Sequence, residues 1–293
     1  MVAAAEKQNQ TCNTEFILLG FGDSPDLQVP LFLLFLVIYV VTMMGNILIL
    51  TLVVADQRLH SPMYLFLSNL SCLEMCSSST ILPKLLASFL TGDRTTSYSS
   101  CLTQFFVFTF LVGVECYLLA VMSYDQYLAV CKPLHYVTLM NPKLCIALAA
   151  GSWVSGFVIS FVITPLMSHM LFCDHREIDH FFCDFAPVTK CSCSDTFLIE
   201  AVTSLMSALC TMLPFLFTVA SYILIIITVL RIVSAVGRQK TFSTCSTHLT
   251  VVAIFYSVLT LVYILPKTYN LAAFNKFFSV FYTVVTPMVW CWF

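Results

Sequence analysis

Residues 122–136 read MSYDQYLAVCKPLHY, and they contain the transition on which the fold assignment depends. Upstream of Asp125 the chain is largely apolar back to about residue 99. Downstream of Tyr127, a short loop carries Lys132 followed by a proline. An apolar stretch of this length that ends in polar and charged residues predicts a helix that crosses a lipid bilayer and stops at its surface.

The whole chain has the composition of a membrane protein. Of its 293 residues, 59% are hydrophobic and 10% are charged, and the mean hydropathy is +0.93. A single soluble domain could not keep so much apolar surface out of water. Seven stretches are long enough to cross the hydrocarbon of a bilayer; they cover about 29–54, 60–87, 99–131, 143–168, 197–231, 242–265 and 274–293. We therefore predict an all-α membrane protein with seven transmembrane helices, in which residues 1–28 precede the membrane domain at 29–293.

The distribution of charge predicts the orientation of these helices. Lysine and arginine are concentrated in the first, third and fifth connections, whereas the N-terminus and the even connections are acidic. Basic connections normally remain in the cytoplasm, so we expect an extracellular N-terminus. Asn9 then begins an Asn-Gln-Thr glycosylation acceptor on the outer side. Residues 1–28 contain no pattern of a cleavable signal peptide, so we expect the first span to act as its own insertion signal.

The stretch 122–136 resembles the MAYDRYVAIC-x-PL-x-Y signature of vertebrate olfactory receptors, a family of rhodopsin-like G-protein-coupled receptors. A second segment, GRQKTFSTCSTHLTVV at 237–252, is similar to the family's KAFSTC-x-SHL motif. Further matches are Ser61–Tyr64 to HSPMY, Pro83-Lys84 to the family's PK pair, and SVFYTVVTPM at 279–288 to its seventh helix. The resemblance covers almost the whole chain. It implies a plasma-membrane odorant receptor that acts through a G protein of the olfactory stimulatory type.

The resemblance also implies which residues take part in signalling, and two segments depart from it. The expected activation and G-protein residues are Asp125, Gln126, Tyr127, Arg238 and Lys240. The two basic residues would equally suit anionic lipid headgroups. The family has arginine where this chain has Gln126, and it continues LNP-x-IYS-L-R-N where this chain reads VWCWF at 289–293. Because glutamine carries no charge, we expect weak or absent coupling to a G protein.

Cys101 and the four cysteines of the long loop 169–196 are expected at the outer side, where disulfides persist. The resemblance implies a bridge between Cys101, at the start of the third helix, and Cys183 in the long loop 169–196. It also implies a bridge within that loop between Cys173 and Cys193. Cys191 is an additional thiol that is either free or a competitor for Cys173.

Three polar residues are predicted at about mid-membrane depth, namely Asn46, Glu74 and Glu115. Polar groups there are costly and must face protein or water. The two acids resemble a pair of acidic positions in the family. They could share a proton, hold a sodium ion through oxygen ligands, or form a neutral hydrogen-bonded pair that only fixes helix packing.

Apolar and hydroxyl side chains at helical spacing predict a ligand cavity between the third, fifth and sixth helices. The candidate lining residues are Gln104, Phe108, Thr109, Val112, Met206, Tyr256, Leu259 and Thr260. Such a cavity suits a small, volatile, weakly polar molecule, and no unpaired acid marks an amine site. The alternative is that each of these side chains belongs to the packed core. His248 is interpreted either as a switch residue or as a hydrogen-bonded helix histidine.

Other functional classes have less support. No catalytic triad, metal motif, phosphate loop or basic stripe indicates an enzyme, a bound cofactor or a nucleic-acid partner. Intramembrane acids also occur in transporters and channels, but inverted repeats and broken-helix pairs are absent from the sequence. The remaining alternative is the product of a degraded receptor gene that is retained in the endoplasmic reticulum.

Overall fold

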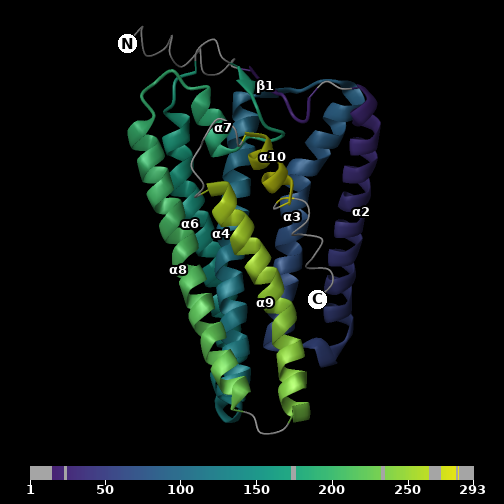
Figure 1. Cartoon of the computed structure of the whole chain (residues 1–293), viewed down its shortest axis with the longest axis vertical. Helices are drawn as coiled ribbons and strands as arrows, with labels where there is room; N and C mark the ends of the chain where they lie inside the picture. Colours follow the sequence, from purple (N-terminus) through teal and green to yellow (C-terminus); the bar gives the residue numbers. More distant parts are fainter. Residues whose placement is uncertain are drawn as a thin grey trace.

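The computed structural model describes residues 15–22, 25–172, 176–231, 235–263, 272–281 and 283. Long helices dominate this part of the chain and run side by side (Figure 1). They are α2 (Pro25–Ala55), α3 (Pro62–Thr91), α4 (Tyr98–Cys131), α6 (Pro142–Ser168), α8 (Phe197–Leu230) and α9 (Ala235–Tyr263), followed by the shorter α10 (Ala272–Val280). Each overlaps one of the seven predicted spans. The predicted all-α membrane fold is confirmed.

Four of the described helices, α2, α4, α6 and α8, are long and apolar enough to cross a membrane. These helices are buried to different extents. In the apolar 18-residue stretch of α4, 61% of the residues are buried, whereas in that of α2 only 17% are. Helix α4 therefore lies at the centre of the bundle, against α3, α6 and α8 (Figure 1). The exposed side of α2 is lined by large apolar residues such as Met44 and Leu48. This surface requires lipid around it.

Local sequence sets where the helices begin and end. The side chain of Asn141 accepts a hydrogen bond from the backbone N–H of Leu144 at 2.9 Å and caps the start of α6. Ser97 caps the start of α4 in the same way, through the N–H of Ser100. Helix α3 ends at Gly92, whose φ of 72° is a left-handed conformation that favours glycine.

Helices α4 and α6 approach each other closely because two glycines face one another. A Cβ atom added at Gly156 would lie 2.6 Å from the carbonyl oxygen of Phe110 and 2.6 Å from a methyl carbon of Val114. One added at Gly113 would lie 3.0 Å from the Cα of Gly156. Small residues of this kind allow backbones to pack without a side chain between them.

One end of the bundle carries a small three-stranded sheet, and we call this the sheet end. Strand β1 (Glu15–Leu18) pairs antiparallel with β2 (Thr95–Ser97) and parallel with β3 (Glu177–Ile178). Phe16 is fully buried and contacts the rings of Tyr98 and Phe172. The short helix α7 (Phe185–Lys190) lies at the same end (Figure 1).

The opposite end of the bundle contains short connections. The 3-10 turn η1 (Gln57–Leu59) joins α2 to α3, while η2 (Pro133–His135) and the one-turn helix α5 (Tyr136–Leu139) join α4 to α6. Arg58 donates its backbone N–H to the Asp56 side chain at 2.9 Å, which orders the first of these turns. The main hydrophobic core extends between the two ends and includes the fully buried Phe66, Leu119 and Phe255.

Candidate functional site

The two intramembrane acids predicted from the sequence are in contact. Glu74 on α3 and Glu115 on α4 share a side-chain hydrogen bond and are 1% and 5% exposed. Because an ionised carboxylate can only accept, a hydrogen bond between two carboxyl groups requires a proton on one of them. The structure therefore brings the two acids together in a buried position between α3 and α4.

Asn46 on α2 is fully buried, and its amide nitrogen donates to the carbonyl oxygen of Thr42 at 2.9 Å. Among the residues described, neither its side-chain oxygen nor one carboxyl oxygen of Glu74 has a hydrogen-bond partner. These oxygens are acceptors of the kind that sodium ions or buried water need. The chemistry of Asn46 and Glu74 is thus compatible with either occupant.

Four of the predicted ligand residues, which lie on α4 and α9, belong to the main hydrophobic core. Phe108, Tyr256 and Leu259 are buried in it, and Val112 packs against it. The Tyr256 hydroxyl donates to the backbone oxygen of Cys116 at 3.3 Å, which links α9 to α4. The buried phenol of Tyr256 is a polar group that would orient a weakly polar ligand.

The other predicted ligand residues are placed differently. Met206 packs against a separate cluster at the sheet end, around Phe105 and Ile163. Thr109 is half-buried. Thr260 lies on an exposed face of α9 with Ala253 and Ser257, away from the cluster that contains Tyr256. The prediction that Thr260 lines the same cavity as Tyr256 is therefore not supported by its position.

Gln104 connects three segments and contributes to structure rather than to an open cavity. Its side-chain oxygen accepts the backbone N–H of Cys183 at 3.0 Å, and its amide nitrogen donates to the carbonyl of Thr80 at 3.0 Å. Cys183 also forms a disulfide with Cys101 at the start of α4. Phe182, next to this bridge, contacts the ring of Phe108 at a centroid distance of 4.9 Å. The loop thus reaches down to the predicted ligand cluster.

The remaining cysteines of this loop are partly described. Cys193 is disulfide-bonded, while its expected partner Cys173 lies outside the described residues. Cys191 is a buried free thiol, and burial raises its pKa. Asn9 and residues 289–293 also lie outside the described part.

At the end opposite the sheet, Asp125 is bonded to a tyrosine. The Tyr136 hydroxyl donates to a carboxyl oxygen of Asp125 at 2.8 Å, and this carboxyl is 3% exposed. Asp125 forms no ion pair with any residue in the described ranges. Burial, together with the charge of Asp125 and the bond to it, raises the pKa of Tyr136, so the phenol remains a donor.

Gln126 belongs to a polar chain that joins three helices. The Tyr222 hydroxyl of α8 donates to the Gln126 side-chain oxygen at 3.0 Å, and the same hydroxyl contacts Nδ1 of His248 on α9. A phenol has one proton, so this arrangement requires the His248 Nδ1–H to donate to Tyr222. His248 is thus a hydrogen-bonded helix histidine, as one of the two interpretations expected.

Sequence reasoning identified Gln126 but not its partners. Tyr136 is the last residue of the stretch 122–136, and a tyrosine that follows a helix gives no signal of which acceptor it meets. Tyr127 is half-buried and stacks near Tyr124. Arg238 is exposed, whereas the side chain of Lys240 lies outside what the structure describes.

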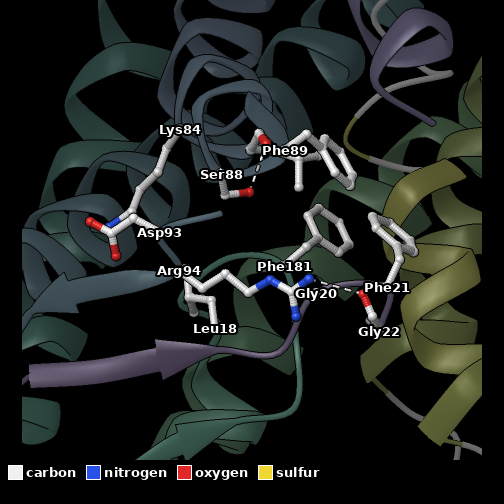
Figure 2. Close-up of a pocket in the computed structure, with 11 residues that line it drawn as sticks. Leu18, Gly20, Phe21, Gly22, Lys84, Ser88, Phe89, Asp93, Arg94 and Phe181 are labelled. Carbon is white, nitrogen blue, oxygen red and sulfur yellow. Dashed lines mark hydrogen bonds between the residues drawn. The ribbon is translucent and has the colours of Figure 1, made fainter. Parts of the chain in front are cut away.

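A small cavity at the sheet end lies between the turn after β1 and the end of α3 (Figure 2). Its wall contains Lys84 and Ser88 from α3, Arg94 and the rings of Phe21, Phe89 and Phe181. Arg94 donates to the carbonyl oxygen of Gly22 at 3.0 Å. Two residues of the cavity wall, Leu85 and Phe181, belong to the same hydrophobic core as Phe108 and Tyr256.

Comparison with known proteins gives one consistent result. A family model described as olfactory receptor matches residues 35–291. The chain is 46% identical to human olfactory receptor 10A7 over 282 residues, which cover 96% of this chain and 89% of the relative. It is 43% identical to human olfactory receptor 5B12 over 96% and 90% of the two chains. Mouse olfactory receptor 5P55 is 45% identical over 97% and 92%.

Proposed function

Because the chain belongs to the olfactory receptor family, we propose that it binds a small, volatile, weakly polar odorant between α4, α8 and α9 and acts on the olfactory stimulatory G protein. The family consists of multi-pass membrane receptors and not of enzymes. In the proposed topology, residues 1–28 are extracellular and residues 29–293 form the receptor domain in the plasma membrane. The sheet end then faces the outside, where the Cys101–Cys183 bridge is chemically stable.

The observation that carries this proposal is the position of Tyr256. Its hydroxyl bridges to the α4 backbone at Cys116 within the cluster that contains Phe108 and Leu259. A ligand that accepts a hydrogen bond from Tyr256 would replace that bridge and separate α9 from α4. Ligand binding and helix position are thereby linked, as a two-state receptor requires.

A cyclic-AMP reporter assay with a panel of odorants tests the proposed site. Phe108→Ala should weaken or abolish every response of the unchanged chain, because it removes a buried ring. The matched control is Phe161→Ala, since Phe161 is 63% exposed on α6 and would face lipid. Equal losses in both variants would exclude a ligand site at Phe108.

Surface delivery must be measured beside this assay. An N-terminal tag on intact cells should be stained if the N-terminus is extracellular and the receptor reaches the plasma membrane. Staining only after permeabilisation would favour a receptor that is retained in the endoplasmic reticulum. Odorant binding would then be measured on the purified protein instead.

At the cytoplasmic end, we propose that Asp125, Gln126 and Tyr127 face the G protein, with Arg238 and Lys240 available to it or to anionic lipid headgroups. Gln126 weakens this coupling for two reasons. It lacks the positive charge that arginine would present, and its side-chain oxygen holds Tyr222 in the chain that ends at His248. Activation must therefore break a bond that links α4, α8 and α9.

We further propose that Glu74 and Glu115 act as a shared-proton pair with Asn46 nearby. The hydrogen bond between the two acids favours this over a sodium ion, because a cation bound by both would require both carboxylates to be ionised. If the two acids share a proton, the odorant response of the unchanged chain should not depend on sodium, and replacement of Glu115 by glutamine should preserve packing and leave the response independent of sodium. A sodium-dependent response of the unchanged chain that this variant loses would favour the ion site.

A further inference from the structure

A narrow groove lies between α8 and α9, toward the end of the bundle opposite the sheet. It encloses about 60 Å³, and its α8 wall extends from Tyr222 to Leu230, which is about 12 Å along the helix axis. Ile226 and Leu230 in this wall are 42% and 68% exposed, so the groove is open to the surroundings of the bundle. These surroundings are lipid, because α8 is long and apolar enough to cross a membrane.

The wall of the groove is largely aliphatic. Ile225 and Val229 are buried on its α8 side, and Leu249 packs against them from α9. Tyr222 lies at the end of the groove that is deeper in the membrane, and its hydroxyl is bonded to Gln126. A long, narrow and apolar space of this kind suits an extended hydrocarbon chain better than a compact polar molecule.

Two arginines lie beyond the other end of the groove. Arg231 directly follows Leu230, and Arg238 precedes Cys245 by two helical turns, on the same side of α9. Both arginines are exposed. Neither side chain forms a hydrogen bond or an ion pair with any residue in the described ranges. A guanidinium keeps its charge at every physiological pH, so both can bind an anion outside the protein.

The helices that form the groove carry no acid near these arginines. The sequence contains no aspartate or glutamate after Glu200, which lies in the first turn of α8 at the sheet end. Within the part that the structure describes, the acids at the arginine end are Asp56, in the connection between α2 and α3, and the buried Asp125 on α4. The charge of Arg231 and Arg238 is therefore complementary to an anionic headgroup at the membrane surface.

We propose that the groove binds one acyl chain of an anionic phospholipid whose headgroup is held by Arg231 and Arg238. The fork of an arginine matches the oxygens of a phosphate or carboxylate, while the aliphatic wall holds the chain. A zwitterionic lipid offers the same chain without a net negative charge, so the arginines should select against it. This inference extends the proposal that Arg238 is available to headgroups, and it requires neither an odorant nor a G protein.

Such a lipid would act on the bonds of Tyr222. This residue belongs to the groove wall, and its hydroxyl donates to Gln126 and contacts His248 of α9. An acyl chain that fills the space between α8 and α9 would hold Tyr222 and His248 in these positions. A ligand that binds one arrangement of the helices stabilises that arrangement by mass action. The bound lipid would therefore favour the arrangement of α8 and α9 described above.

Photo-cross-linking of the purified full chain in nanodiscs, without odorant, tests the proposal. The probe is a phosphatidylserine with a diazirine on one acyl chain, in a bilayer of phosphatidylcholine. The label should be recovered on peptides that contain Ile226, Leu230 or Leu249. Unlabelled phosphatidylserine should compete better than phosphatidylcholine, on the order of five-fold for each arginine that contacts the headgroup. Equal competition by the two lipids would indicate ordinary bilayer lipid and overturn the proposal.

Variants with matched controls locate the site. Arg231→Gln should lower the labelling several-fold, whereas Arg231→Lys keeps the charge and should retain most of it. Lys143→Gln is the control, because Lys143 is an exposed lysine of the same end. Ile226→Trp should block the groove, while Ile223→Trp changes an exposed residue of α8 outside the groove wall. Labelling of Arg231→Gln or Ile226→Trp equal to that of the unchanged chain would contradict the proposal.

Thermal unfolding separates a lost site from a folding defect. The midpoints in phosphatidylcholine alone show whether each variant is folded. Phosphatidylserine should raise the midpoint of the unchanged chain and of Ile223→Trp, but not that of Ile226→Trp. An equal rise in Ile226→Trp would place the lipid elsewhere and refute the groove. Because no odorant is present, a failure of the odorant proposal would leave these results unaffected.

Discussion

The hydroxyl of Tyr222 lies 3.0 Å from the side-chain oxygen of Gln126 and donates its proton to it. An arginine at position 126 could not accept that proton, because a guanidinium has only donors. Tyr222 would then accept from the arginine and donate toward His248, which reverses the polarity of the chain between α4, α8 and α9. A single substitution thus changes both the charge and the direction of the bonds at the end opposite the sheet.

Replacement Gln126→Arg should raise the odorant-evoked cyclic-AMP signal several-fold at equal surface expression. The arginine can pair with Asp125 at rest and present its charge to a G protein on activation. Gln126→Met is the matched control, because it keeps the side-chain length without charge or hydrogen bonding. Indistinguishable responses of the unchanged chain and the arginine variant would show that position 126 does not limit coupling.

Tyr222→Phe should lower the free energy of unfolding by about 1–3 kcal/mol, because it leaves buried groups of Gln126 and His248 without this partner. Thermal unfolding followed by a thiol-reactive dye measures the change. In Tyr39→Phe, the removed hydroxyl bonds to Ser79 at an exposed position, so a much smaller effect is expected. Equal unfolding midpoints for Tyr222→Phe and Tyr39→Phe would contradict this role of Tyr222.

Gly156→Ala should destabilise the contact of α4 with α6 by about 1–3 kcal/mol, because the new methyl would meet backbone at 2.6 Å. Gly151→Ala on the same helix provides the control, since a Cβ there meets nothing within 4 Å. It should be neutral or slightly stabilising, as alanine favours helices. Comparable unfolding midpoints for both variants would contradict the close approach.

Acidification should loosen the loop that contains His180. Burial, aided by the charge of Lys276, lowers the pKa of His180 to about 3, whereas an unfolded histidine has a pKa near 6.5. Between these values the unfolded chain binds more protons, so stability is complete above about pH 6.5 and is lost as the pH falls toward 3. At pH 5 the loss should be on the order of 2 kcal/mol.

The pH prediction is checked by thermal unfolding at neutral and acidic pH. His180→Asn should reduce the difference, because the amide oxygen can replace Nδ1 as acceptor for the Phe182 N–H but does not titrate. His169→Asn changes an exposed histidine of the same end and should leave the pH dependence intact. A His180→Asn protein as acid-sensitive as the unchanged chain would refute the role of His180.

The helices and the pair of acids could be predicted from the sequence because the lipid environment restricts what an apolar segment can form. Backbone polar groups must be satisfied within each span, so a long apolar run leaves few alternatives to a helix. Glu74 and Glu115 stand out because a carboxyl in an apolar run needs a partner, and each is the other's partner. Gln126 stood out only through its departure from a motif.

Other features could not be predicted from the sequence, because they depend on how each helix is rotated about its axis and on contacts between distant segments. Thr260 follows Tyr256 by four residues and so shares its side of α9, yet the buried arc of that helix ends at Tyr256. Four residues advance about 40° around the helix axis, which places the Thr260 hydroxyl outside the buried arc. The hydrophobic periodicity of a sequence does not determine the rotation of a helix to within that angle. The three strands of the sheet are two to four residues long, too short for an alternating pattern to be recognised.

The glycine contact between α4 and α6 has a mechanical consequence. Two helices whose backbones are in contact cannot slide or tilt independently without steric clashes. Helices α4 and α6 therefore move together as one rigid unit. Helix α9 is joined to this unit through the hydroxyls of Tyr256 and Tyr222. These hydrogen bonds can change partners without any movement of α4 and α6. Helix α9 is therefore the helix whose position can change, and its two hydrogen-bonded attachments, at His248 and Tyr256, lie about two helical turns apart.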